Sequence, residues 1–466
     1  MKISIQLNID HENGDPAIIK PIAEFRRNDL TSDTLGLTIE GSKILLKNIQ
    51  FELIQQQIEQ YIAKNKQCKQ CNKERKIKGY NKIVYRTLFG KIKLQNPRLY
   101  TCSCCKGNEQ KSFSLLSQII SERTSPEFEY LQTKWASLVS YGMAANILED
   151  VLPIHANISS IYNTTHKAAK RLDAEIGEEQ DCYINGCEEE WSNLPPPTTS
   201  LTVGIDGGYI HAREGDNRKA GWFEAIVGKS LHETQSSKRF GFVCKYDDKP
   251  KSRLNTMLQK QGFQMNQEIV FLSDGGDTVK NLQKHIAPYS EHLLDWFHIT
   301  MRITVLKQMI KGLQDVLKEE LSKQLESIKW NIWHGNVRKA LDKIDSFSED
   351  LYENEIDKSS KRYKFWKYAD EFYNYIKSNQ HLITNYAEKY KYGETISTSF
   401  VESTVNEVIS KRMVKKQQMR WTQEGAHRMI QVRISTLNNE LKAAFYRWYP
   451  NINHSNDTQS VGNLAA

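Results

Sequence analysis

Hydrophobic and polar positions alternate with two different periods along the chain. Residues 44–62 read ILLKNIQFELIQQQIEQYI, where apolar residues recur every three or four positions, and this spacing predicts an amphipathic helix. Within 125–180, the stretches WASLVSYGMAANILEDVLP and HANISSIYNTTHKAAKRLDAEIGEE continue the helical pattern. Two short helices with a turn between them fit a helix-turn-helix, whose second helix enters the major groove of DNA. They fit an ordinary helical hairpin equally well.

The period changes after SNLPPPTTS at 192–200, a stiff proline-rich linker. Short apolar runs there predict strands, with helical spacing at 252–263 and 278–289. The strands are expected at LTVGID (201–206), WFEAIVGKSL (222–231), KRFGFVCKY (238–246) and EIVFLSDGG (268–276), and HLLDWFHI (292–299) is a fifth strand or a strand-to-helix junction. The order β-β-β-α-β-α-β predicts an α/β fold with an RNase H-like mixed sheet.

The rest of the chain after the predicted sheet is helical in pattern, and 300–392 has no strand signal. We therefore interpret that stretch as a helical insertion in the sheet domain. The predicted organisation is an N-terminal helical and irregular region (1–65), a cysteine module (66–107), a helical DNA-binding region (108–191), the linker (192–200), the first part of the core (201–299), the insertion (300–392), C-terminal core helices (393–450) and a disordered tail (451–466).

Composition narrows the class of partner without deciding it. The chain has 64 Lys and Arg against 56 Asp and Glu, a net charge of +8, which suits a polyanion. No run approaches the ~20 apolar residues that span a membrane, and the first residues lack the apolar core of a signal peptide. We expect a cytoplasmic protein, where disulfides are rare, so its eight cysteines need another explanation.

Five of the cysteines fall between 68 and 105, and four of them form two C-x-x-C pairs. The intervening residues alternate and turn at Gly90 like a hairpin, an arrangement typical of a zinc ribbon. Cys104 competes with Cys105 for the fourth position, and buried or reactive cysteines are the alternative to a structural Zn²⁺. The predicted ligands are Cys68, Cys71, Cys102 and Cys105. The hairpin also carries cations suited to phosphate contacts, namely Lys82, Arg86, Lys91, Lys93 and Arg98.

Two aspartates end predicted strands and precede glycine pairs. Asp206 is followed by Gly207-Gly208, and Asp274 by Gly275-Gly276. An Asp-Gly step alone is a common turn. In the predicted topology, however, the first and fourth strands are neighbours, so both carboxylates could face one site. Two-metal phosphoryl transfer needs such shared carboxylates on rigid elements.

A third acidic candidate, Glu402, precedes a strongly basic stretch. Between 408 and 433 there are seven Lys and Arg but one acid, Glu424. A charge run is usually a solvated face, but this imbalance favours DNA phosphates led towards a catalytic carboxylate. The candidate DNA-binding residues are Lys411, Arg412, Lys415, Lys416, Arg420 and Trp421. Asp295 and His298, just after the fifth strand, are candidates for a place near the site, with a capping aspartate as the plainer interpretation.

The sequence over roughly 200–450 resembles the ISKra-type transposases of bacterial insertion sequences. The matching stretches are VGIDGGYI, FEAIVGKS, FLSDGG, LDWFHITMRITVLKQ, KWNIWHGN, ISTSFVESTVNEVISKRMVKKQQMRWT and FYRWYP. The resemblance implies a DDE triad of Asp206, Asp274 and Glu402 on an RNase H-like core. Asp295-x-x-His298 is similar to the D-x-x-H signature of Mutator-related transposases.

The resemblance implies a DNA transposase that binds the terminal inverted repeats of its element in the bacterial nucleoid. It would cleave and join DNA with two Mg²⁺ or Mn²⁺ ions, as a homodimer or higher oligomer on double-stranded DNA. Two other functions remain open at this point. One is an RNase H-like structure-specific nuclease, and the other is a domesticated DNA-binding regulator without catalysis.

Overall fold

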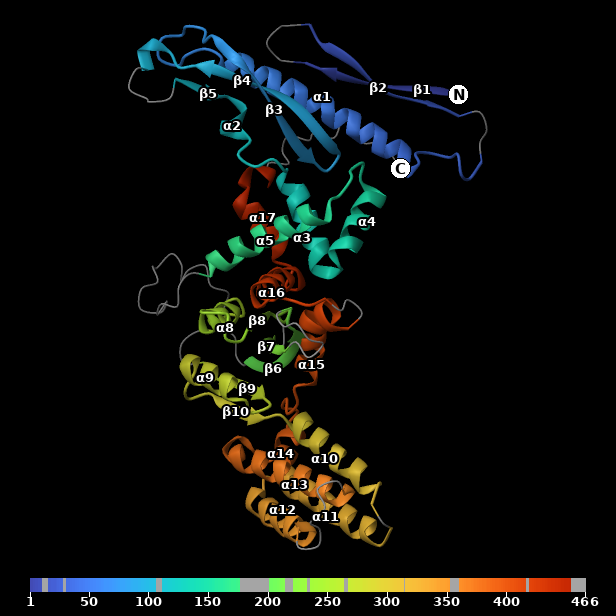
Figure 1. The fold of residues 1–466 in the computed structure, drawn as a ribbon, viewed down its shortest axis with the longest axis vertical. Coiled ribbons are helices and arrows are strands. Elements are labelled where there is room, and N and C mark those ends of the chain that lie inside the picture. Colours follow the sequence, from blue (N-terminus) through green and yellow to red (C-terminus); the bar gives the residue numbers. More distant parts are fainter. Residues whose placement is uncertain are drawn as a thin grey trace. The chain divides into compact units, whose positions relative to one another are not determined.

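The computed structural model divides into two compact units, and each forms its own arrangement of elements (Figure 1). The N-terminal unit comprises residues 1–168 and 441–466, and the central unit comprises 169–440. The predicted linker at 192–200 and most of the predicted tail lie outside the described residues. The structure describes 1–10, 16–27, 31–105, 111–176, 201–213, 221–232, 235–263, 267–313, 315–352, 360–415 and 419–453.

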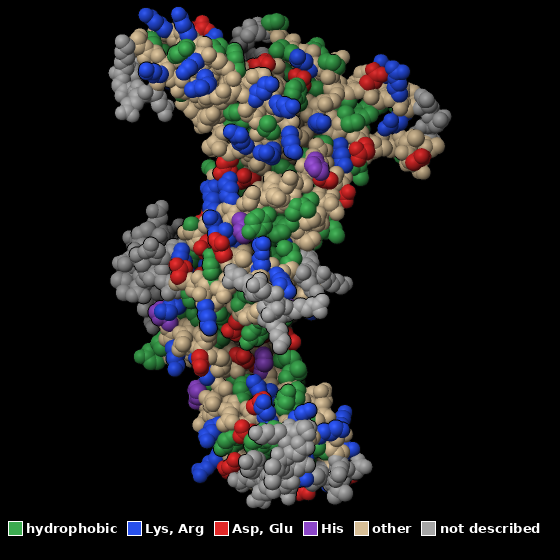
Figure 2. Space-filling view, in the orientation of Figure 1, with side chains coloured by type: hydrophobic (Ala, Val, Ile, Leu, Met, Phe, Trp, Pro, Cys, Tyr) green, Lys and Arg blue, Asp and Glu red, His purple; other side chains and the backbone are tan. Residues whose placement is uncertain are grey.

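The N-terminal unit begins with an antiparallel pair, β1 (Lys2–Ile9) and β2 (Ile18–Arg26), followed by the long helix α1 (Ile39–Asn65). The Thr38 side chain caps α1 by accepting a hydrogen bond from the Gly41 N–H at 3.0 Å. A three-stranded antiparallel sheet follows, built from β3 (Ile77–Thr87), β4 (Gly90–Tyr100) and β5 (Ser112–Ser114). Its apolar face packs on α1 through Ile54, Ile58, Ile83, Ile92, Leu94 and Leu116. Figure 2 shows many Lys and Arg side chains over this region.

Helices complete the N-terminal unit: α2 (Leu116–Ile119), α3 (Pro126–Leu138), α4 (Tyr141–Val151), α5 (Ile158–Glu175) and α17 (Leu441–Trp448). The division between the two units falls within α5. The Tyr130 ring of α3 meets the Phe445 ring of α17 edge-on, with centroids 5.5 Å apart. The sequence pattern groups 441–448 with the core helices, but the aromatic face of this segment packs against α3.

The central unit is a mixed α/β structure around a five-stranded sheet. The strand order is β10-β9-β6-β7-β8, parallel across β10, β9 and β6 and antiparallel across β6, β7 and β8. The elements run β6 (Leu201–His211), β7 (Trp222–Leu231), β8 (Arg239–Val243), α8 (Pro250–Gln259), β9 (Ile269–Ser273), α9 (Asp277–Ile286) and β10 (Glu291–Leu294), in the order that the apolar pattern predicted.

Different helices cover the two faces of the sheet. Leu201, Val203 and Ile205, at alternate positions of β6, enter a core with residues of α8 and α9. On the opposite side lie α15 (Ser399–Val405), a π-helix over Asn406–Val414, and α16 (Gln423–Leu437). The functional candidates fall on this second side.

The predicted insertion consists of helices in its described residues: α10 (Trp296–Ile310), α11 (Asp315–Trp333), α12 (Val337–Tyr352), α13 (Lys361–Ser378) and α14 (Tyr386–Lys391), with a 3-10 turn at Gln380–Leu382. These helices share their own apolar core. Trp333 packs there, 4.8 Å from the Trp296 ring, whereas Trp330 is 48% exposed. Within the described residues, no helix is both long and apolar enough to cross a membrane.

Candidate active site

Two glycines of β6 determine where Asp206 points. A Cβ added at Gly204 would lie 2.1 Å from Cγ2 of Val401, and one at Gly208 would lie 2.9 Å from Cδ1 of Ile409. Only glycine therefore lets α15 and the following π-helix approach the strand so closely. Alternate residues of a strand share a face, so Asp206, midway between these glycines, faces the same helices.

Asp274 is the first residue after the neighbouring strand β9. β9 is parallel to β6 with Leu272 opposite Gly204, and two residues further along the two strands come Asp274 and Asp206. Gly275, with φ of 85°, turns the chain away, and the Gly276 N–H donates to Oδ1 of Asp274 at 3.0 Å. The prediction that the first strand ends at Asp206 is wrong, because β6 stays paired with β7 through Gly207 and Gly208 to His211. The two aspartates nevertheless come together at the edge where β9 ends.

The helical insertion supports the turn after β9. The Tyr375 hydroxyl of α13 donates to the Asp274 carbonyl at 3.1 Å, and the Arg302 guanidinium of α10 lies 4.0 Å from the Tyr375 ring centroid. A Cβ at Gly275 would lie 2.4 Å from Oδ1 of Asn379, so this turn too is closely packed. The insertion thus fixes the backbone at Asp274.

At this edge, which contains Asp206 and Asp274 and which we call the Asp206 edge, the negative charge is not balanced by positive charge. Asp206 is 9% exposed, and burial raises its pKa to about 6, with the negative charges of Asp274 and Asp295 adding to the rise. His298 and the Gly207 N–H, which donates to Oδ1 of Asp206 at 2.7 Å, act in the opposite direction but do not cancel the shift. A desolvated carboxylate beside a second carboxylate fits a divalent cation, which would stabilise both charges.

Asp295 connects this edge to the helix that carries Glu402. Its buried carboxylate caps α10 by accepting from the Phe297 N–H at 2.8 Å, and it also accepts from the Thr398 N–H at 2.9 Å and from the Thr398 hydroxyl. The Thr398 carbonyl in turn accepts from the Glu402 N–H at 2.9 Å. Asp295 is a capping aspartate, and it also holds the first turn of α15.

His298 is bound to the same carboxylate, with Nδ1 2.7 Å from Oδ2 of Asp295. Burial lowers the pKa of His298. The hydrogen bond and charge of Asp295, with contributions from Asp206 and Asp274, outweigh burial and leave that pKa raised. His298 therefore favours its cationic form beside the two aspartates.

Glu402 is exposed in the first turn of α15, and no ion-pair partner of its side chain is found in the described part of the chain. The two neighbouring glutamates are engaged elsewhere: Glu407 accepts from Arg239 at 3.0 Å, and Glu394 accepts from Lys389 at 2.7 Å. Asp206, Asp274 and Glu402 do not form a group with all ligand atoms within 4.8 Å in the described chain. The exposed Glu402 side chain would have to turn inward to share ions with the aspartates.

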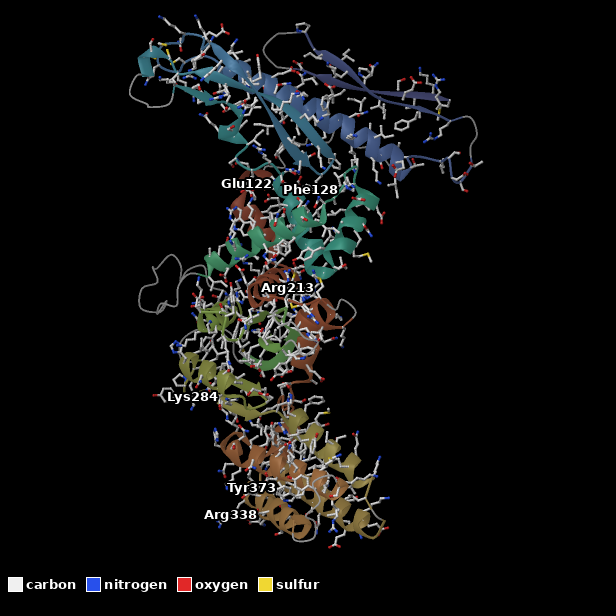
Figure 3. All side chains as sticks on the ribbon, viewed as in Figure 1. Glu122, Phe128, Arg213, Lys284, Arg338 and Tyr373 are labelled. Atoms are coloured by element: carbon white, nitrogen blue, oxygen red, sulfur yellow. The ribbon has the colours of Figure 1, made fainter. Side chains whose placement is uncertain are left out.

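Two of the predicted DNA-binding residues lie inside the protein. Arg412 is fully buried and Trp421 is 4% exposed, with the guanidinium 5.2 Å from the indole centroid. The Trp421 carbonyl accepts from the N–H of Arg213, a residue labelled in Figure 3. The π-helix turns Arg412 inward, so neither residue is available to DNA in this structure. Lys411, Lys415 and Arg420 are exposed, and Lys416 lies outside the described residues.

Four thiols gather in the N-terminal unit. Sγ of Cys68 lies 3.4 Å from that of Cys104, and Sγ of Cys71 lies 3.3 Å from that of Cys102. All four sulfurs lie within 4.8 Å of one another, so each could reach a shared Zn²⁺ at about 2.3 Å with small adjustments. The fourth member is Cys104, where the C-x-x-C spacing favoured Cys105. The Cys105 side chain lies outside the described residues.

A second group, Asp173, Asp247 and His427, also has ligand atoms within 4.8 Å of one another and could hold a divalent ion by residue type. A guanidinium already lies among these atoms. Arg253 donates to Asp247 at 2.7 Å, pairs with Asp173, and lies 3.0 Å from Nε2 of His427. Hydrogen bonding from His427, followed by that from Arg253, holds the pKa of Asp173 well below its usual range. No motif in the sequence connects these residues.

Comparisons with known proteins do not identify a family for this chain. No family model matches the chain, and no curated protein matches it. Among solved structures, a Drosophila P element transposase strand transfer complex aligns over 72% of this chain and 95% of its own, with 9% identity and a TM-score of 0.31. NurA aligns over 55% of this chain and 74% of its own, with 14% identity and a TM-score of 0.12. Similarities this distant carry no argument about fold or function.

Proposed function

We propose that this chain is a DDE-type transposase, of the ISKra type that its sequence resembles, with Asp206, Asp274 and Glu402 as the catalytic carboxylates. One observation carries the proposal: Asp206 within β6 and Asp274 just after β9 each lie two residues beyond the paired Gly204 and Leu272, and Glu402 lies in the first turn of the helix packed against Gly204. On this proposal the mixed sheet is an RNase H-like core, and the substrate is the terminal inverted repeat of the element.

The donor set fits two Mg²⁺ or Mn²⁺ ions, because three carboxylates supply the hard oxygen ligands that these cations prefer. When bound, the ions activate the attacking water or 3′-OH and stabilise the leaving oxygen. Asp206, held by the Gly207 N–H at 2.7 Å, would contact both ions. Asp274 and Glu402 would each complete the ligands of one ion.

The surrounding residues position this machinery. Asp295 holds the start of α15 through Thr398 and so fixes the backbone of Glu402. His298 lies near the aspartates, and its raised pKa favours a positive charge there that would attract a DNA phosphate. Tyr375 fixes the carbonyl of Asp274 from the insertion.

The test is a cleavage and joining assay on DNA carrying the inverted repeats that flank the gene. We expect Mg²⁺-dependent cleavage followed by joining to a target, and loss of both with Asp206→Asn. The matched control is Asp277→Asn, an exposed aspartate in the first turn of α9. Cleavage without joining would favour the nuclease, and binding without any chemistry would favour the regulator.

A further inference from the structure

The N-terminal unit contains a polar cavity of about 440 Å³ that the proposed chemistry does not use. It lies where the closed end of the β3–β4 hairpin meets α3 and the start of α5. Arg86 and Lys91 line it from the hairpin, Gln132 from α3, and Ser159 from α5. Phe128, labelled in Figure 3, lines its apolar side.

The hairpin gives this cavity a positive charge. Arg86 and Lys91 are directly opposite each other in the β3–β4 register, so their side chains share one face of the sheet. Neither cation has an ion-pair partner among the described residues, and no carboxylate is found among the described residues that line the cavity. Two unpaired cations on one wall favour an anionic ligand.

The start of α5 adds a partial positive charge to the same cavity. This 18-residue helix begins at Ile158, and the Ser159 N–H donates to Oδ1 of Asn157 at 2.9 Å. The first turn of a helix presents backbone N–H groups and the positive end of the helix dipole, which together favour phosphate. Ser159, Ser160, Asn163 and Thr164 bring small polar side chains to the lining.

Gln132 provides an independent indication of a ligand. Its side chain is 2% exposed and lines the cavity, yet its Oε1 has no hydrogen-bond partner within the described part of the chain. Buried polar atoms are nearly always paired, so an unpaired one calls for an explanation such as a bound ligand. The amide can present its NH₂ group instead of its oxygen after a flip, and that group donates to an anion.

We propose that this cavity binds a backbone phosphate of double-stranded DNA, seated at the start of α5 between Arg86 and Lys91. The inference rests on the proposed function and deepens it, because it assigns a DNA contact to a site in the N-terminal unit. Tyr162 and Asn163 are exposed on the same helix, so a strand held by its phosphate at this site would pass along that face.

The sharpest test changes one exposed residue in two ways. Ser159→Asp adds a negative charge in the first turn of α5, where an acid stabilises the helix but repels a phosphate. Ser159→Asn is the neutral control of the same size. By fluorescence anisotropy with a labelled mixed-sequence duplex, we expect Ser159→Asp to bind about tenfold or more weakly than Ser159→Asn. We expect its melting temperature to be equal to that of Ser159→Asn or higher.

A second variant measures the charge contribution. Arg86→Gln with Lys91→Gln should reduce the slope of log K against log salt by about 0.9 for each phosphate that the protein no longer neutralises. The charge-preserving exchange Arg86→Lys with Lys91→Arg should retain most of that slope. Inorganic phosphate is added in a parallel titration to distinguish a free anion site from a DNA contact.

Each outcome has a defined meaning. Equal duplex binding by Ser159→Asp and Ser159→Asn, with wild type binding normally, overturns this inference and leaves the proposed function standing. Inorganic phosphate that stabilises the wild type while the variants keep full duplex affinity overturns the assignment to DNA. A wild type that binds no duplex at all overturns the proposed function together with the inference.

Discussion

Two acidic groups of the central unit differ in how their charge is balanced. Asp173 and Asp247 surround the buried Arg253 guanidinium, and the pKa of Asp173 is held well below its usual range. Asp206 and Asp274 lie near His298 instead, and the pKa of Asp206 is raised to about 6 despite this cation. Both groups contain metal-ligand residue types, so residue type alone does not separate them.

The difference indicates which group stabilises the fold and which is a site. Carboxylates that already contact a guanidinium gain little from a cation, which would have to displace a buried arginine. Carboxylates that are desolvated without such a partner destabilise the metal-free protein and gain most from binding one. We therefore propose that the Arg253 cluster serves stability and that the Asp206 edge binds metal.

The largest expected effect is on activity. Asp206→Asn, Asp274→Asn and Glu402→Gln keep shape but remove charge, and an amide is a poor ligand for a hard cation. Each should lower the rates of cleavage and strand transfer at least about a thousandfold. Steady-state cleavage of terminal-repeat DNA measures this, with Asp277→Asn as control. Full activity in any one variant would remove that residue from the site.

The four cysteines of the N-terminal unit are a third group of negatively charged ligands. Four thiolates repel one another unless a cation lies between them. Backbone N–H groups of Cys71 and Gln70 lower the pKa of Cys68 to about 5 and so favour its thiolate. Cys104→Ser should release zinc and unfold the module, since metal binding supplies its folding free energy. Cys105→Ser should leave zinc in place. Elemental analysis measures the bound zinc, and circular dichroism measures the folding of the module. Loss of zinc in Cys105→Ser but not in Cys104→Ser would make Cys105 the ligand.

The balanced acidic group should respond in stability. Asp247→Asn leaves the buried Arg253 short of a partner, and breaking such a pair costs about 3–5 kcal/mol. Urea unfolding should show this loss in the free energy of unfolding, while cleavage per folded molecule stays near wild type. If cleavage disappeared while stability was unchanged, Asp247 would belong to a catalytic metal site instead.

The Asp206 edge should show the opposite dependence on pH. The folded-state pKa of about 6 lies above the ordinary aspartate value of 3.8, so the folded protein binds this proton more tightly. Its contribution to stability is therefore present below about pH 4 and is lost as the pH rises towards 6, by about 3 kcal/mol at most. Unfolding of metal-free wild type and Asp206→Asn at several pH values isolates this contribution. Identical pH profiles would contradict it.

The smallest effect concerns the cations beyond Glu402. Lys411 and Lys415 are exposed, whereas Arg428 is paired with Glu424. Lys411→Gln and Lys415→Gln should each lower the slope of log K against log salt by about 0.9, because each substitution removes one contact between a lysine and a DNA phosphate. Arg428→Gln should change it less. Equal slopes for all three would make the lysines an ordinary solvated face.

The sequence predicted what depends on local pattern. Alternation and glycine turns located the five strands in order and placed Asp274 at the end of β9, but they were wrong to end the first strand at Asp206, because β6 continues through Gly207 and Gly208 to His211. The roles that it missed depend on pairings across long distances in the chain. Position 204 must be glycine because Val401 packs against it, and Asp295 accepts a hydrogen bond from the Thr398 N–H. Such contacts leave no periodic signal.

The basic stretch shows a second limit of sequence reasoning. The prediction assumed that all seven cations between 408 and 433 are exposed. In the structure Arg412 is buried, and Arg433 donates to the Glu407 carbonyl at 2.8 Å. The π-helix over Asn406–Val414 changes which side chains face the sheet, and a helical period of 3.6 does not anticipate this. The Arg253 cluster was missed because its members come from three separate segments.

Binding of Mn²⁺, measured by electron paramagnetic resonance on metal-free protein, tests the central contrast most directly. Wild type and Asp247→Asn should bind the same number of Mn²⁺ ions per folded chain, and Asp206→Asn should bind fewer. If Asp206→Asn retained every ion while Asp247→Asn lost one, the metal site would lie at the Arg253 cluster, and its assignment to the Asp206 edge would be contradicted.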